Sequence, residues 1–520
     1  MTISPFPKYA DPTLELVAVL LALVVLRVIQ SWSRRPLPPG PRGLPLVGNA
    51  YDIPQKKSWL VYRDLAAQYG DVVALHAFGQ TLVIVSSVKA AVDLLEKRSA
   101  IYSDRQDSVL AVMTGWTWNL ALKRYGDNWR QVRRLFWKHF QPKTVSKYHP
   151  VQQREARRLL RRLLDDQSDL DSKIKLSLSA TILTAVHGLP IEDITYHYVK
   201  ILNESEKGVA EAFTPGAFLV EFIPWLRHVP SWVPGTGWQK KVLRWRAQAN
   251  AICEDPYRAA QDAAMPGVAH LSVLSELLSE MSHPGDSAER GEGERVVKET
   301  TAVAFGAGTD TTAATLLAFF CSMILHPEIQ RRGQAELDAV VGRERLPEHA
   351  DRPLLPYINA LVKELLRWHN VAPLGVAHRC MEEDEYRGWR IPKGAVIMPN
   401  AWAMLHDPEV FPEPEAFRPE RFLKDRELDP DVLDPGSVTF GFGRRVCPGR
   451  YFADDALFIN VASLLHVFDI MPALNELGQP IPVEAKMTSG FLSYLEDFQY
   501  AIRPRSGGAE ALIRAEGGVV

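Results

Sequence analysis

Cysteine is scarce in this chain, and the spacing of the few cysteines excludes several kinds of site. Four occur among 520 residues, at positions 253, 321, 380 and 447, and no Cys-x-x-Cys pair is present. A zinc site or a redox dithiol uses closely spaced cysteines, and a disulfide framework uses many more of them. We therefore expect free cysteines in a reducing compartment.

A surplus of charge is also lacking. The chain has 60 basic and 62 acidic residues, a formal net charge of −2. Nucleic-acid-binding proteins carry an excess of basic side chains, so we expect no nucleic-acid partner. Internal repeats and long low-complexity tracts are absent from the sequence as well, which excludes solenoid and fibrous architectures.

One long apolar run is present near the N-terminus. Residues 14–29 are apolar apart from Glu15 and Arg27, which stand near the two ends of the run. A helix of that length reaches ~24 Å, against ~30 Å of hydrocarbon, and snorkelling by Arg27 makes a slightly longer span adequate. The sequence predicts a single transmembrane anchor at residues 12–30. A cleaved signal peptide and a buried soluble helix are the alternatives.

Basic and proline-rich sequence follows this anchor. Arg34 and Arg35 precede the run Pro36-Leu-Pro-Pro-Gly-Pro-Arg-Gly-Leu-Pro45. The positive-inside rule then places the bulk of the chain in the cytosol and residues 1–11 in the lumen. The proline run cannot be helical, so residues 31–49 are predicted to form a stiff hinge, with a linker or a proline-rich ligand as the other interpretations.

The rest of the sequence indicates a mainly α-helical body with small β-sheets. Most segments show helical periodicity, whereas residues 71–86 alternate on both sides of Gly79, which predicts a hairpin. We expect the body to cover residues 50–505. The glycine-rich residues 506–520 are predicted to be a flexible tail.

A glycine-rich loop around Cys447 presents one sulfur. The stretch reads Phe440-Gly-Phe-Gly-Arg-Arg-Val-Cys-Pro-Gly-Arg450 and runs into an apolar, helix-permissive segment. The N–H groups of such a loop and a helix N-terminus favour an anion, so we expect the pKa of the Cys447 thiol to be lowered. A lone thiolate in a dry pocket is a soft metal ligand, and haem iron is one metal that it suits. A buried cysteine in a tight turn is the alternative.

The spacing F-x-x-G-x-x-x-C-x-G, met by Phe440, Gly443, Cys447 and Gly449, resembles the haem-binding signature of the cytochrome P450 family. The resemblance implies the cytochrome P450 fold and haem (iron protoporphyrin IX) as the cofactor. It implies that Cys447 is the axial ligand of the haem iron and that Phe440 packs over the sulfur. It also implies that Arg445 pairs with a haem propionate.

Two further motifs fit the same family. Trp129 and Arg133 are i, i+4 on a predicted helix, and W-x-x-x-R resembles the family helix that holds a propionate. An ordinary amphipathic helix is the alternative. His378 and Arg379 begin a predicted strand, and the resemblance implies that one of them, with His378 favoured, reaches the second propionate.

A predicted helix at 296–325 carries a stripe of small residues. Ala304, Ala307, Gly308 and Thr311 share one face, although each glycine inside a helix costs about 1 kcal/mol. Close helix packing is one explanation. The sequence A-G-x-D-T-T also resembles the family's oxygen-binding helix, which implies room for dioxygen at Gly308 and proton delivery by Thr311 with Asp310.

Eight positions receive a structural or pocket role from the resemblance. Glu364 and Arg367, in E-x-x-R, are expected to join Arg421 as a structural cluster. The aromatic stretch at 102–122 overlies the haem in the family, so Trp116 and Trp118 are candidates for the substrate pocket. The other pocket candidates lie on the predicted small-residue helix: Ala304, Phe305 and Ala307.

The resemblance implies a monooxygenase that oxidises a lipophilic small molecule with O2. Electrons would come from NADPH through a separate NADPH–cytochrome P450 reductase, which would dock on the basic face of Arg130, Arg134 and Lys138, with cytochrome b5 as a further donor. The pattern looks like fungal members in the endoplasmic reticulum membrane that oxidise secondary metabolites such as terpenoids. A haem-thiolate isomerase or dehydratase and a non-enzymatic haem sensor are the alternatives.

Overall fold

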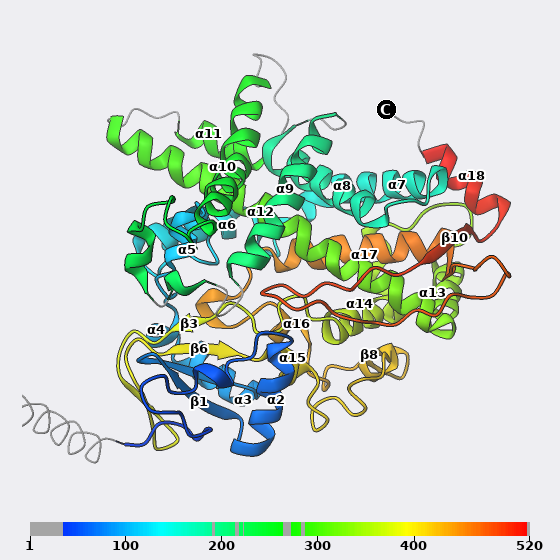
Figure 1. Ribbon diagram of the computed structural model, residues 1–520. Helices are drawn as coiled ribbons and strands as arrows, with labels where there is room; N and C mark the ends of the chain where they lie inside the picture. The colour runs from blue at the N-terminus through cyan, green and yellow to red at the C-terminus, as the bar shows by residue number, and fades with distance from the viewer. Residues whose placement is uncertain are drawn as a thin grey trace, which may run out of the picture.

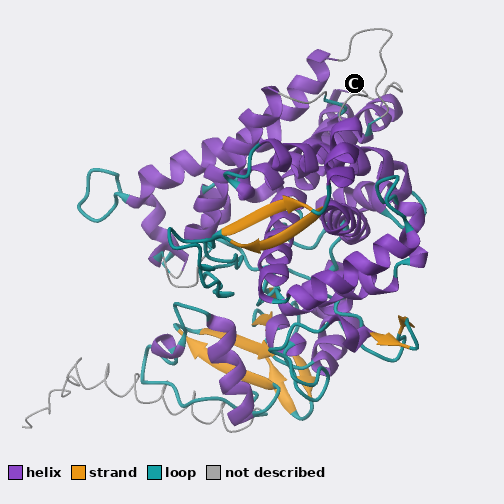
Figure 2. Ribbon diagram, turned by 90° about the vertical axis from the view of Figure 1, so that its right-hand side faces the viewer, coloured by secondary structure: helices purple, strands orange, loops and turns teal. Residues whose placement is uncertain are grey.

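The computed structural model describes residues 35–189, 193–213, 218–221, 223–263, 272–281 and 287–516. The predicted lumenal segment and transmembrane anchor lie outside these residues, so both remain predictions. The described part is mainly helical with small sheets, as the sequence predicts. Figure 1 and Figure 2 show the helices filling the upper and right-hand part of the molecule, with the largest sheet below them.

The helices follow one another along nearly the whole described chain (Figure 1). Their bounds are α2 (Ser58–Tyr69), α3 (Val88–Ala91), α4 (Ser99–Tyr102), α5 (Val109–Met113), α6 (Asp127–Phe140), α7 (His149–Asp165), α8 (Leu170–Ile182), α9 (Asp193–Ala212), α10 (Trp238–Ala263), α11 (Val273–Met281), α12 (Ser287–Leu325), α13 (Pro327–Val340), α14 (Pro356–Trp368), α15 (Ala401–Leu405), α16 (Gly436–Thr439), α17 (Arg450–Val467) and α18 (Gly507–Glu516). Short turns of helix connect several of them, among them η2 (Val92–Lys97), η3 (Trp116–Trp118) and η10 (Gly443–Arg445).

The largest sheet has the strand order β1-β2-β6-β3. The predicted hairpin is confirmed, because β1 pairs antiparallel with β2 and Phe78 and Gly79 turn the chain with φ of 50° and 84°. Three two-stranded sheets complete the β-structure. The strands are β1 (Val72–Ala77), β2 (Gln80–Val85), β3 (His378–Arg379), β4 (Asp384–Tyr386), β5 (Trp389–Ile391), β6 (Val396–Pro399), β7 (Leu423–Lys424), β8 (Glu427–Leu428), β9 (Phe468–Pro472) and β10 (Tyr500–Pro504).

Helix α12 is the axis of the helical part. It packs against α6, α8, α10 and α17, so its middle is surrounded on most sides. Within the described residues, its segment Gly291–Leu325 alone is long and apolar enough to cross a membrane, but 78% of the apolar window is buried inside the molecule. Hydrophobic contact with neighbouring helices therefore explains the apolar composition of α12.

The prediction of a flexible C-terminal tail is wrong for most of its length. Gly507–Glu516 forms α18, which lies at the upper right in Figure 1. Ala509 and Ile513 are buried against the main core, and Ser506 Oγ accepts a hydrogen bond from the Ala509 N–H at the start of the helix. The glycines at 507 and 508 mark a helix start rather than a disordered segment, and packing of two apolar side chains stabilises the helix.

Because Ile513 is 1% exposed, Ile513→Ala is expected to reduce the free energy of unfolding by about 2–5 kcal/mol. Arg514→Ala, on the exposed side of the same helix, is the control and is expected to change it by less than about 0.5 kcal/mol. Thermal or denaturant unfolding measures both. Equal stability of the Ile513→Ala protein and the wild type would mean that α18 does not support the core.

Candidate active site

The Cys447 loop is built on close backbone contacts. Gly443 has φ of +54°, and a Cβ atom there would lie 2.2 Å from the carbonyl oxygen of Leu95 in η2. The N–H of Cys447 donates to the carbonyl of Phe440 at 2.7 Å, which closes the loop. Thr439 Oγ1 donates to the Leu366 carbonyl at 3.0 Å and ties the start of the loop to α14. The position of the sulfur is thus set by the backbone on both sides.

The protein surroundings alone do not give the Cys447 thiol the expected low pKa. Burial raises the pKa, and this effect outweighs the N–H of Gly449 and the positive charges of Arg133 and Arg450, which act in the expected direction. A bound cation reverses this balance, because a thiol that coordinates a metal loses its proton. Among the described residues no group of three or more His, Cys, Asp or Glu could hold a metal ion.

Three arginines converge on the segment between α4 and α6 and on the Cys447 loop. Arg445 donates to the carbonyls of Ser103, Leu120 and Lys123 at 2.6, 3.3 and 2.9 Å. Arg105 donates to the carbonyls of Ala121, Val376 and Ala377 at 2.8, 2.8 and 2.9 Å. Arg133 donates to the carbonyl of Val446, next to Cys447, at 2.6 Å. All three guanidinium groups are therefore fixed by neutral backbone acceptors.

Arg105 is buried and Arg133 and Arg445 are half-buried, and the three cations have little compensating negative charge. Burial lowers the pKa of Arg133 and that of Arg445 to about 10 each, and it lowers the pKa of Arg105 well below its ordinary value. Asp104, the carboxylate that acts on Arg105 and Arg445, is already paired with Arg124 at 2.7 Å. Because buried charges are normally paired, the arrangement suits an anionic group of more than one charge.

The two candidates on β3 point to different places. His378 is 4% exposed, and its Nδ1 lies 2.7 Å from the Tyr102 carbonyl. Burial lowers the pKa of His378 well below its usual value, and the charge of Arg105 lowers it further. Arg379 instead lies 3.4 Å from the carboxylate of the exposed Asp107. Of the two side chains, the structure therefore brings His378 to the buried arginines.

Trp129 contributes a buried donor with no acceptor. Its Nε1 is shielded from solvent and forms no hydrogen bond within the described residues. The guanidinium of Arg445 lies 4.5 Å from the centre of the Trp129 ring, so the two predicted residues are adjacent. An unsatisfied buried N–H beside buried guanidinium groups is expected where a carboxylate is to be bound.

The small-residue stripe on α12 serves two purposes. A Cβ atom on Gly308 would lie 2.8 Å from Ile182 of α8, so Gly308 allows two helices to pack closely. Ala307 is exposed, and Gly306, Gly308 and Thr311 are partly exposed, although residues 301–305 and 312–316 of α12 are buried. This face of a core helix is therefore open to space. The Thr311 hydroxyl donates to the Ala307 carbonyl at 2.9 Å, so it stays within its helix.

Asp310 and Thr311 are neighbours in sequence, but they make separate contacts. The carboxylate of Asp310 is 5% exposed and lies 3.8 Å from Nζ of Lys175. It accepts a hydrogen bond from the Tyr494 hydroxyl at 2.5 Å. The two predicted members of the acid–threonine pair therefore do not form a hydrogen bond with each other in this state.

The other pocket candidates differ in position: two tryptophans lie beside α12, and two residues of α12 itself are buried. Trp116 and Trp118 lie 5.0 Å apart by ring centre, and Trp118 approaches α12 where a Cβ on Gly306 would be 3.4 Å from its ring. Phe305 is fully buried and packs edge-on against Tyr198 at 6.1 Å. Phe305 is thus a core residue, and the prediction that it lines the pocket is wrong. Ala304, at 7% exposure, is buried at the side of the open face.

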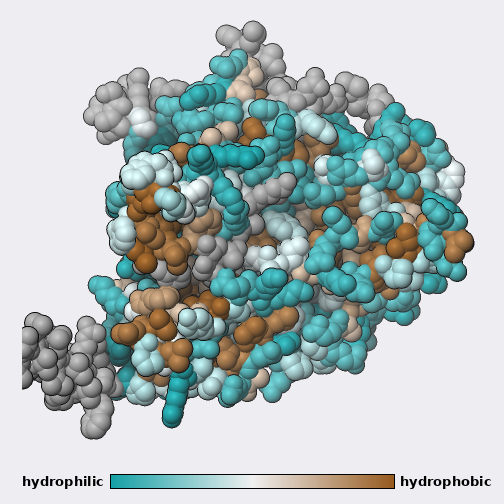
Figure 3. Space-filling view, in the orientation of Figure 1, coloured by the Kyte–Doolittle hydropathy of each residue, from teal (hydrophilic) through white to brown (hydrophobic). Residues whose placement is uncertain are grey.

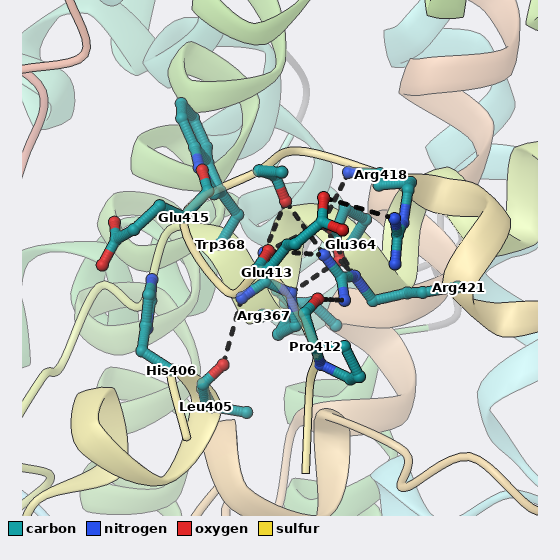
Figure 4. Close-up of polar contacts among 12 residues, drawn as sticks. Glu364, Arg367, Trp368, Leu405, His406, Pro412, Glu413, Glu415, Arg418 and Arg421 are labelled. Carbon is teal, nitrogen blue, oxygen red and sulfur yellow. Dashed lines mark hydrogen bonds and ion pairs between the residues drawn. The ribbon is translucent and has the colours of Figure 1, made fainter. Parts of the chain in front are cut away.

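The predicted cluster of Glu364, Arg367 and Arg421 is present, and Figure 4 shows its polar contacts. Arg367 donates to both oxygens of Glu364, at 2.7 and 2.9 Å, and the two side chains are fully buried. Arg421 Nε lies 3.2 Å from Glu364. The two arginines also donate to the carbonyls of Leu405, Pro412, Glu413 and Ala416. A buried ion pair can be stabilising only when its remaining donors and acceptors also form hydrogen bonds, as they do here.

Comparison with known proteins gives the same answer as the geometry. The family model for cytochrome P450 matches residues 38–495. The chain belongs to the cytochrome P450 family. It is 40% identical over 507 residues to cytochrome P450 monooxygenase 208 of Postia placenta, with 97% of each chain covered. It is 38% identical over 498 residues to cytochrome P450 monooxygenase COX2 of Coprinopsis cinerea, with 95% of this chain and 94% of that protein covered.

A third relative, cytochrome P450 monooxygenase claR of Ampulloclitocybe clavipes, is 38% identical over 509 residues, with 96% of this chain and 92% of that protein covered. The chain is accordingly a cytochrome P450 monooxygenase, and haem is the cofactor of its family. The residues present fit that group. The buried arginines and the unpartnered Trp129 N–H suit two propionates, and the lone Cys447 sulfur suits the iron.

Sequence reasoning missed Arg105 and Tyr494. Arg105 is 5% exposed and joins Arg445 and His378, yet no motif marks it in the sequence. Its partners Val376 and Ala377 lie more than 270 residues away along the chain, at separations of 271 and 272. The one available signal was an arginine between two apolar stretches, which predicts an exposed residue at least as often as a buried one.

The two loop glycines, Gly443 and Gly449, differ in how well they tolerate substitution by alanine. Gly443→Ala is expected to destabilise the protein by about 3 kcal/mol or more, because the new Cβ overlaps the Leu95 carbonyl and φ is positive. Gly449→Ala is the matched control, since its Cβ would meet Phe136 at 3.9 Å, and a change below about 1 kcal/mol is expected. Thermal unfolding and haem content report both. Equal losses in the two variants would contradict the backbone contact at Gly443.

Proposed function

We propose that this monooxygenase hydroxylates, or otherwise oxidises, a lipophilic small molecule with dioxygen and with electrons that NADPH supplies through a separate reductase. The open face of α12 supports this proposal most directly. Ala307 and Thr311 face free space in the middle of the molecule, while the surrounding helix is packed. An apolar interior with a few polar groups binds apolar ligands and orients them by those groups.

We further propose that the substrate is a secondary metabolite, such as a terpenoid intermediate. The support is indirect: the relatives named above are fungal monooxygenases of the same family, matched over nearly their whole length. The aromatic surface of Trp116 and Trp118 beside α12 would suit a rigid apolar scaffold.

Each group in the site would have a separate task. Haem, when bound, supplies the one-electron chemistry and the activation of dioxygen that side chains cannot provide. Cys447 would hold the iron, while Arg105, Arg445 and the Trp129 N–H would hold the propionates. The Thr311 hydroxyl would hold a proton at Oγ1 on the open face, and the apolar surroundings would exclude bulk solvent from it.

The electron donor would dock on the surface that α6 and the Cys447 loop share. Arg134 and Arg444 are exposed there, which favours an acidic reductase and, in the same way, cytochrome b5. Arg130 is paired with Asp127 at 2.6 Å, and Lys138 is paired with Glu280 at 2.5 Å. We therefore give Arg134 a larger part in docking than the other two members of the predicted basic face.

We also propose that the protein sits on the cytosolic face of the endoplasmic reticulum membrane, with residues 12–30 as a single anchor. Exposed apolar side chains support a membrane contact, among them Trp225 at 64% and Trp232 at 82% exposure, and Leu46 at 100%. Figure 3 shows apolar side chains gathered on the left of the molecule, and the described chain begins on the same side in Figure 1. Exposed aromatic groups are typical of a membrane interface.

Quenching of tryptophan fluorescence by brominated lipids tests this contact on the full chain. The double variant Trp225→Phe/Trp232→Phe is expected to lose about half or more of the quenching, because interfacial tryptophans are the ones that reach the lipid. Trp137→Phe, which removes a partly exposed tryptophan of α6, is the control and is expected to change it little. The reverse order of effects would place the membrane on another face.

The reaction is tested with microsomes that contain the protein and a fungal NADPH–cytochrome P450 reductase, incubated with lipophilic scaffolds. We expect an oxidised product that requires NADPH and O2. Cys447→Ala is expected to lose all detectable product, whereas Cys321→Ala, at a cysteine buried in α12, retains it. Wild-type turnover by the Cys447→Ala protein would contradict the proposal, and turnover without NADPH would favour an isomerase.

A further inference from the structure

Asp310 is held from two sides on the buried flank of α12. The Tyr494 hydroxyl donates to Oδ2 at 2.5 Å, and Nζ of Lys175 on α8 lies 3.8 Å from Oδ1. Oδ1 itself is buried and forms no hydrogen bond within the described residues. A buried carboxylate that leaves one oxygen unsatisfied is unusual, and such groups are frequently used in a reaction.

Lys175 connects this carboxylate to the surface. Its side chain is 9% exposed and also pairs with Asp171, at 3.1 Å, whose side chain is 43% exposed. Burial raises the pKa of Asp171, the charge and hydrogen bond of Lys175 lower it, and the charge of Asp310 raises it to a smaller extent, so all three groups act on one another. The charged side chains of Asp171, Lys175 and Asp310 therefore form a continuous chain of contacts from the solvent to α12.

Tyr494 belongs to a loop that is held together as a unit. Thr488 and Tyr494 exchange two hydrogen bonds, from the Thr488 N–H to the Tyr494 carbonyl at 2.7 Å and from the Tyr494 N–H to Thr488 Oγ1 at 3.0 Å. Ser493 Oγ donates to the Thr488 carbonyl at 2.9 Å, and the Ser493 N–H donates to Val371 at 2.8 Å. Movement of any part of this loop therefore moves the Tyr494 hydroxyl.

The same loop makes an aromatic contact through Phe491. The ring of Phe491 lies 6.2 Å from that of Phe213, at the end of α9. Figure 1 shows the red loop between β9 and β10 extending to the middle of the molecule, where α12 passes. One loop thus carries an aromatic contact with the end of α9 and a hydrogen bond to Asp310.

We propose that Tyr494 is a positioning residue for Asp310, and this role rests on the proposed monooxygenase function. Its hydroxyl keeps Oδ2 occupied, so Oδ1 is the oxygen that takes a proton from Lys175, whose N–H bond breaks as the O–H bond forms. Lys175 regains a proton from hydronium in the bulk solvent beside Asp171, so no hydroxide is left behind, and Asp310 passes its own proton across α12 toward the open side. Without the Tyr494 hydroxyl, the Asp310 carboxylate forms a closer ion pair with Lys175. It then delivers protons less often.

Tyr494→Phe tests this role because it removes the hydroxyl and keeps the ring. We expect product formed per NADPH to fall about three- to tenfold while hydrogen peroxide rises, since a charge-assisted hydrogen bond is lost at the acid. We also expect D2O to slow product formation more than in the wild type. Tyr500→Phe is the matched control, because the Tyr500 hydroxyl donates to the Gln167 carbonyl, away from Asp310. It is expected to leave all three quantities unchanged.

A second measurement does not depend on turnover. Thermal unfolding of Tyr494→Phe, Asp310→Asn and the double variant forms a cycle, and contacting residues give non-additive changes. We expect the double variant to unfold within about 1 °C of Asp310→Asn alone, because the hydroxyl acts through the carboxylate. Tyr494→His keeps a ring and an N–H donor, and it is expected to recover part of the product yield.

Three outcomes separate the two proposals. An active wild type with unchanged product yield and D2O effect in Tyr494→Phe would overturn the role of Tyr494 alone. Additive changes in unfolding temperature would overturn it as well. Absence of any oxidised product from the wild type would overturn the proposed function and, with it, this role.

Discussion

The Cys447 sulfur is held in place by backbone geometry, and the other features of the site follow from that position. Gly443 lies against the Leu95 carbonyl, and the loop closes through the hydrogen bond from Cys447 to Phe440. Behind it, Thr439 joins the loop to α14, which carries Glu364 and Arg367. The hydrogen bonds of this buried ion pair join α14 to the segment around Arg421 and leave few of its donors unsatisfied.

The second constraint is buried positive charge. Arg105, Arg133 and Arg445 donate to neutral carbonyls, and burial lowers the pKa of each of them. The protein therefore carries an electrostatic cost that a bound dianion removes. This explains why folding and cofactor binding are expected to be linked in this chain, because a ligand that binds the folded state alone stabilises it.

Local signals in the sequence were sufficient for the hairpin at 72–85, for α12 and for the cluster of Glu364, Arg367 and Arg421. They failed where long-range packing decides. The glycines at 507 and 508 suggest a loose tail, yet Ile513 is buried against the core. Burial reverses the expected shift of the Cys447 pKa. Contacts across hundreds of residues, such as Tyr494 with Asp310, have no local pattern from which to predict them.

The central claim is that Cys447 binds haem iron as a thiolate, and its most direct test is the absorption difference spectrum of the reduced protein with and without carbon monoxide. The account predicts the red-displaced Soret band that thiolate ligation gives. A haem-loaded protein whose Soret band stays at the position of histidine-ligated haem, or a folded protein that takes up no haem, would contradict it.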